Sequence, residues 1–195
     1  MYRFLIAAVF VLASLPGSAF AYGYAEAEDP MVVLFKSALV EAKNDRWGEV
    51  AKLADKGVKS FKDHLFEAEA LSPRFADAVK TKNLNLVAET FANLVYVSIR
   101  NKIHSNLREN FKNFKNAKSR LSMARKSYID VLDGNVKKQD AKRSESILKE
   151  FDKALEALGS PGLFGVGKKE ANAKLYKEAV NAIEASIEKT FKSFK

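Results

Sequence analysis

The sequence predicts an all-α protein: an up-and-down antiparallel bundle of four to five main helices, preceded by a cleaved signal peptide. Apolar residues recur at intervals of three and four along most of the chain, and no useful length alternates with a period of two. Good helix formers predominate, and the 195 residues include only four prolines. Short connections between the periodic segments favour antiparallel neighbours.

The beginning of the chain has the pattern of a bacterial-type secretory signal peptide, residues 1–21. Arg3 supplies a positive start, an apolar stretch covers 4–15, and Ala19-Phe20-Ala21 places small residues before a cleavage point. The apolar stretch is shorter than the about 20 residues that span a bilayer, and an uncleaved anchor is the alternative. We therefore expect a periplasmic or secreted protein with a flexible tail at 22–29 and one helical-bundle domain at 30–195.

Prolines and polar residues mark the helices of the first half. Asp29-Pro30 and Ser72-Pro73 each read as an N-cap followed by proline at the first helical position. Asn44-Asp45-Arg46 indicates a short break with Asp45 capping the next helix, and a helix that continues through the break is the alternative. The apolar stripes predict helices at 30–42, 47–70 and 73–82.

The longest apolar stripe runs from Leu84 to Leu132 and is the centre of the predicted bundle. One straight helix over this range would be about 73 Å long. A compact domain of this size has a radius of gyration of about 16 Å, so a kink or turn is expected. We place it at 110–117, where three asparagines weaken helix propensity. Asp133-Gly134-Asn135 is expected to end the stripe, with glycine in the left-handed C′ position.

Two helices complete the prediction, from about Lys137 or Asp140 to Leu158 and from Lys168 to about Phe194, with Gly159 ending the first. The glycine-rich linker between them fits G-x-x-x-x-G-K, but Lys169 follows where a phosphate-binding loop needs Ser or Thr. No strand precedes it, so a nucleotide site is not expected. Instead, Leu163 and Phe164 are expected to dock on the bundle end or to grip a partner.

Several classes of chemistry are excluded or disfavoured. Cysteine is absent, which removes disulfides, thiolate metal sites and covalent c-type haem. No nucleophile motif such as G-x-S-x-G is present. Non-covalent haem would need a histidine to meet Met31 or Met123 across the core, which the spacing does not demand. We therefore expect no cofactor and do not favour an enzyme.

A metal-binding bundle is the alternative function. His64 and Glu67 are three residues apart and would share a face of the predicted helix. A ferritin-like site needs Glu-x-x-His from two helices, yet Phe61 and Asn101 occupy the positions three before the two histidines. The alternative therefore depends on His64 with Glu67, or on a small-ligand pocket between helices.

Positive charge is concentrated in residues 100–126. This segment has nine Lys or Arg and one acid, Glu109, for a formal charge of +8, which equals that of residues 22–195 together. The simpler interpretation is a solvated face whose lysine stems cover the edge of the core. The functional hypothesis is binding of an acidic protein or anionic envelope component, including peripheral membrane association. The expected binding residues are Arg100, His104, Arg108, Lys112, Lys115 and Lys126. Nucleic acid is not expected, because no recognised nucleic-acid module is present.

Overall fold

The computed structural model describes residues 28–162 and 166–194. Its α-helices are α1 (Pro30–Lys43), α2 (Trp47–Lys59), α3 (Ser72–Lys80), α4 (Leu84–Arg108), α5 (Phe114–Ser127), α6 (Asp133–Gln139), α7 (Ala141–Ala157) and α8 (Ala173–Thr190). A 3-10 turn covers Glu69–Leu71 and a π-helical turn covers Tyr128–Leu132. Within the described ranges there is no β-strand, only an isolated bridge between Ser160 and Lys169, so the all-α prediction is confirmed. The predicted signal peptide, most of the tail, Leu163 and Phe164 lie outside the described residues.

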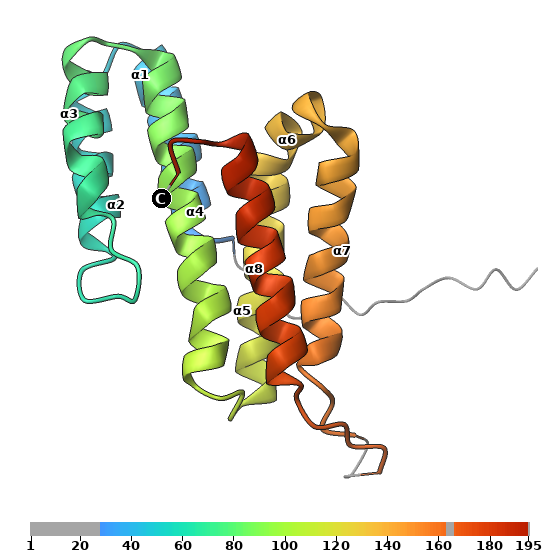
Figure 1. The fold of residues 1–195 in the computed structure, drawn as a ribbon. Coiled ribbons are helices and arrows are strands. Elements are labelled where there is room, and N and C mark those ends of the chain that lie inside the picture. The colour runs from blue at the N-terminus through green and yellow to red at the C-terminus, as the bar shows by residue number, and fades with distance from the viewer. Residues whose placement is uncertain (1–27, 163–165, 195) are drawn as a thin grey trace, which may run out of the picture.

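Helix α4 is the central element of the bundle. The first three helices gather beside its N-terminal half, and α5, α7 and α8 lie along the other side (Figure 1). Every residue from Phe91 to Ile99 is buried. All of these residues except Asn93 and Ser98 are apolar, and a helix with apolar residues on every side is stable when other helices surround it.

The predicted interruption of the long stripe is confirmed. Helix α4 ends at Arg108, and a tight turn leads into α5 at Phe114. Asn110 and Phe111 adopt left-handed backbone angles, φ 48° and 55°. Asn113 then caps α5, its side chain accepting a hydrogen bond from Asn116 N at 3.0 Å. The chain therefore reverses direction here and α5 runs back along α4 (Figure 1).

The predicted helix end at Asp133-Gly134-Asn135 is wrong. The chain continues from α5 through the π-helical turn into α6, and Gly134 is not in a left-handed conformation. The Asp133 carboxylate accepts hydrogen bonds from the hydroxyls of Tyr128 at 3.0 Å and Ser144 at 2.6 Å, which holds it within the bundle. The break falls at Asp140 instead, where the side chain caps α7 by accepting from Arg143 N at 3.0 Å.

The predicted helix at 47–70 is too long, because α2 ends at Lys59. An irregular segment follows, and Asn101 of α4 holds it. The Asn101 side chain donates to the Phe66 carbonyl at 2.8 Å and accepts from Phe66 N at 3.1 Å. These two bonds satisfy the backbone N–H and C=O of Phe66, which a helix would otherwise satisfy. The tertiary contact therefore allows an irregular segment where the apolar pattern predicts a helix.

The remaining boundaries are partly as predicted. Asp29 caps α1 ahead of Pro30, and Gly159 is left-handed at φ 75° after α7. The break at 44–46 exists, but Asp45 is not the cap of α2; its carboxylate accepts from the Trp47 indole at 2.5 Å. The Ser72 side chain makes no cap bond, since Ser72 is already helical. Helix α8 begins later than predicted, at Ala173.

Gly57 marks a close approach of α2 to α4. A Cβ built there would lie 2.4 Å from Cδ2 of Leu94, a fully buried side chain. We expect Gly57→Ala to lower the free energy of unfolding by about 1 kcal/mol, because overpacking outweighs the gain in helix propensity. Gly48 in the same helix has open space around it, so Gly48→Ala should stabilise by about 0.5 kcal/mol. Urea unfolding of both variants measures the contrast, and equal effects would contradict the close contact.

Candidate anion-binding surface

The basic segment 100–126 does not form one basic face. Several of its bases pair with acids, three of which come from distant parts of the chain. The pairs are Arg100–Glu184 at 2.9 Å, Lys102–Asp29 at 2.8 Å, Arg120–Glu109 at 2.6 Å, Arg125–Asp152 at 3.5 Å and Lys126–Asp130 at 2.5 Å. The charge that the sequence concentrates in one segment is therefore largely balanced by the fold.

Arg100 and His104 share one internal carboxylate. Glu184 of α8 lies 2.9 Å from Arg100 Nε and 3.0 Å from His104 Nε2. The Arg100 guanidinium also stacks on the ring of Phe66, 3.8 Å from its centre. Burial opposes ionisation of Glu184, but His104 and Arg100 together hold its pKa below the usual value. An anion was expected beside His104, and the structure places the protein's own Glu184 there.

Lys102 belongs to a buried polar cluster that anchors the beginning of α1. Asp29 is 3% exposed and accepts hydrogen bonds from Met31 N, Ser98, Lys102 and Ser127. Burial alone would raise the pKa of Asp29, yet the charge and hydrogen bond of Lys102 help to hold it below the usual value. This cluster is structural, because its donors and acceptors are directed at one another.

Four of the predicted binding residues are exposed, Arg108, Lys112, Lys115 and Lys126, and the first three lie at the turn between α4 and α5. Among the residues that the structure describes, none of the three forms an ion pair. Arg108 and Lys112 do lower the pKa of Glu109 by their charge, after the larger effect of its hydrogen bond from Arg120. They are thus the part of the predicted set that an external anion can approach.

The start of α8 brings further lysines to the same end of the bundle (Figure 1). The rings of Phe111 in the turn and Tyr176 in the first turns of α8 pack edge to face, with centres 5.1 Å apart. We call this surface the basic end; its exposed bases are Arg108, Lys112, Lys115, Lys169, Lys174 and Lys177.

Two helices begin at the basic end, and neither has an acid in its first turn. A helix N-terminus carries partial positive charge, so acids are the residues that stabilise it. Lysines beside two such termini add to the positive potential rather than relieve it. A bound anion would relieve it, and the exposed side chains supply the donors.

A buried network holds the turn against α8. Asn106 Nδ2 donates to the Ala117 carbonyl at 2.9 Å and to the Tyr176 hydroxyl at 3.0 Å, and Tyr176 donates to the Ile103 carbonyl at 3.1 Å. The turn's own amides are already bonded, since Phe111 N donates to the Asn106 carbonyl. Side chains and helix termini, rather than a concave array of free amides, therefore create the positive surface.

The predicted metal pair does not share a helix face. His64 and Glu67 are both exposed and lie in the irregular segment after α2. The Glu67 carboxylate accepts from Asp63 N at 3.2 Å. In the described part of the chain, no three His, Cys, Asp or Glu side chains gather closely enough to hold a metal ion.

The described helices include none with the length and apolar character needed to cross a membrane.

Sequence reasoning missed the acids and amides that organise this surface. Glu184 and Asp29 take up three of the bases, and Asn106 joins the helices below the turn. The only local signal was polar residues at inward positions of apolar stripes, such as Asn101 and Asn106 in α4.

Comparisons of the chain with protein-family models, curated proteins and solved structures find no match, so the interpretation of this surface depends on its own geometry.

Proposed function

We propose that this chain is an exported, non-enzymatic helical-bundle protein that binds an anionic envelope surface or acidic partner through its basic end. The observation that carries the proposal is the convergence of Arg108, Lys112 and Lys115 with two helix N-termini that lack acids. The proposed binding surface includes only part of the segment 100–126. Arg100, His104 and Lys126 already have carboxylate partners within the chain.

The binding test uses vesicles rich in phosphatidylglycerol and, as a soluble polyanion, polyglutamate. The variant Arg108→Gln/Lys112→Gln/Lys115→Gln should bind vesicles about 100-fold more weakly, because each base near an anionic surface contributes about 1 kcal/mol. Binding of the unaltered protein should weaken steeply between low and physiological ionic strength. Vesicle sedimentation and titration calorimetry measure both effects.

A matched control removes the same charge elsewhere. Lys80, Lys138 and Lys149 are exposed and lie away from the basic end, so Lys80→Gln/Lys138→Gln/Lys149→Gln should lose far less affinity. Equal losses in the two variants would show that net charge alone drives binding. An affinity that does not change with ionic strength would contradict an electrostatic contact.

The export part of the proposal depends on the pattern in residues 1–21. Expression of the full chain in a bacterium should yield a product outside the cytoplasm whose N-terminus is Tyr22. Fractionation and intact-mass measurement check this. Recovery of the uncleaved chain in the cytoplasm would contradict export. The proposal that the basic end binds anions would then depend on the vesicle measurements alone.

A further inference from the structure

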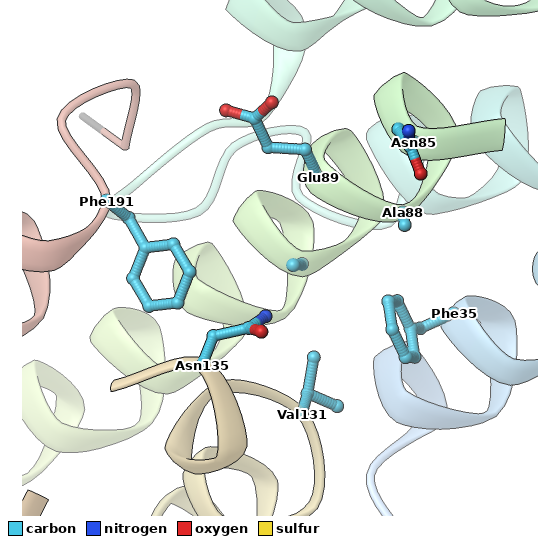
Figure 2. A pocket seen from close by; sticks show the side chains of 8 residues that line it. Phe35, Asn85, Ala88, Glu89, Val131, Asn135 and Phe191 are labelled. Atoms are coloured by element: carbon cyan, nitrogen blue, oxygen red, sulfur yellow. The ribbon is translucent and has the colours of Figure 1, made fainter. Parts of the chain in front are cut away.

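A pocket of about 190 Å³ lies between α1, α4, the π-helical turn, α6 and the segment after α8, away from the basic end (Figures 1 and 2). Phe35 and Phe191 reach it from opposite sides in Figure 2. Ala88 and Ala92 of α4 and Val131 of the π-helical turn complete its apolar lining. An enclosed cavity of about 150 Å³ accommodates a benzene ring, and this pocket has a similar volume but is partly open to solvent, so one planar ring with a small substituent fits it.

The space exists because of two departures from regular helix. The π-helical turn places Val131 at the pocket and is followed directly by α6, which contributes Asn135; π-helical turns inside helices are frequent at functional sites. Helix α8 ends at Thr190, and Phe191 then turns toward α4. The last described residues are fixed there, since Asn93 donates to the Ser193 carbonyl at 3.3 Å and Phe194 stacks on Tyr96.

Three polar side chains, Asn85, Glu89 and Asn135, complete the lining. The Asn135 amide points into the pocket between Val131 and Phe191 in Figure 2. The Glu89 carboxylate is bound by Arg74 Nη2 at 2.7 Å and Ser193 Oγ at 2.7 Å, so its charge is already balanced. The two amides provide hydrogen-bond donors and acceptors, and the paired carboxylate adds no unbalanced charge, so the ligand does not need to be charged.

We propose that this pocket binds a small neutral molecule with one planar ring and an amide group. The ring would lie between Phe35 and Phe191, and the amide would exchange hydrogen bonds with Asn135. Apolar walls with a few convergent polar groups are the usual composition of small-molecule sites. The site is independent of anion binding at the basic end.

The test follows amide chemical shifts of the isotope-labelled protein during titration with benzamide, toluene and benzoate. Benzamide should give saturable shifts around Ala88, Val131 and Asn135. Benzoate should bind about tenfold more weakly, because its charged carboxylate would lose hydration and would find no cationic side chain in the lining. Equal affinity for benzamide and benzoate, or no saturable shift with benzamide, would overturn the proposal.

Two variants and one control locate the site. Ala88→Leu fills the pocket and should abolish the benzamide shifts, whereas Ala185→Leu makes the same change on an exposed position of α8 and should preserve them. Asn135→Ala, at an exposed position, should weaken benzamide about fivefold and leave toluene unchanged. Benzamide binding that survives Ala88→Leu, or that Asn135→Ala leaves unchanged, would refute this location.

Discussion

Replacing Asp29 with alanine should lower the free energy of unfolding by about 3 kcal/mol. The side chain accepts hydrogen bonds from Met31 N at 2.9 Å, Ser98 at 2.9 Å, Ser127 at 2.9 Å and Lys102 at 2.8 Å. Removing one partner of a buried ion pair typically costs about 3–5 kcal/mol, because the remaining charge is left uncompensated. The Lys102 side chain is 18% exposed and keeps some hydration, which places the expected loss at the lower end.

The contribution of Asp29 should also depend on pH in a defined direction. Its pKa in the folded protein is lowered, so the unfolded chain binds the proton more tightly. The stabilisation is therefore fully present above the unfolded pKa of about 4 and is lost as pH falls through the lower folded pKa. The difference in free energy of unfolding between the unaltered protein and Asp29→Asn should therefore decrease as the pH is lowered below about 4.

Urea unfolding followed by circular dichroism measures both effects. Asp55→Ala is the matched control, because the Asp55 side chain is 61% exposed and, within the described part of the chain, its one ion pair is with Lys59 on the same helix. Its effect should stay within about 0.5 kcal/mol. A loss at Asp29 as small as that at Asp55 would contradict the role of the buried cluster.

The contrast between Gly159 and Gly134 shows which helix ends the sequence could predict. Both follow an apolar stripe, but Gly159 stands at the start of a glycine-rich linker and does adopt the left-handed conformation. Gly134 lies between Leu132 and Val136, both fully buried, and their packing keeps the chain helical through it. Local propensity at a glycine is worth about 1 kcal/mol, which two buried side chains outweigh.

The candidate surface was predictable only in part, because a sequence gives the order of charges along the chain and not their arrangement in space. Residues 100–126 do hold the exposed bases Arg108, Lys112 and Lys115. Nothing in the sequence indicates that Glu184 approaches Arg100 or that Asp29 approaches Lys102, since these partners are separated by 84 and 73 positions. The lysines at the start of α8 join the surface only because α8 packs beside the turn.

Replacing Asn106 with leucine should lower the free energy of unfolding by about 2–3 kcal/mol. Asn106 is fully buried and bonds to the Ala117 carbonyl and the Tyr176 hydroxyl, so it joins α4, α5 and α8 beneath the basic end. Leucine has a similar size but removes both bonds and leaves buried polar groups without this partner. Tyr176→Phe removes one hydroxyl and should cost about 1 kcal/mol.

A double-mutant cycle separates the shared bond from general damage to the core. Because the 3.0 Å bond between Asn106 and Tyr176 is lost in either single variant, the double variant should be more stable than the sum predicts, by about 1 kcal/mol. Strict additivity would show that the two residues act independently. Phe151 is fully buried with its ring 5.9 Å from that of Tyr128, and it takes no part in the hydrogen bonds of Asn106, so Asn106→Leu with Phe151→Leu should be additive and serves as the control.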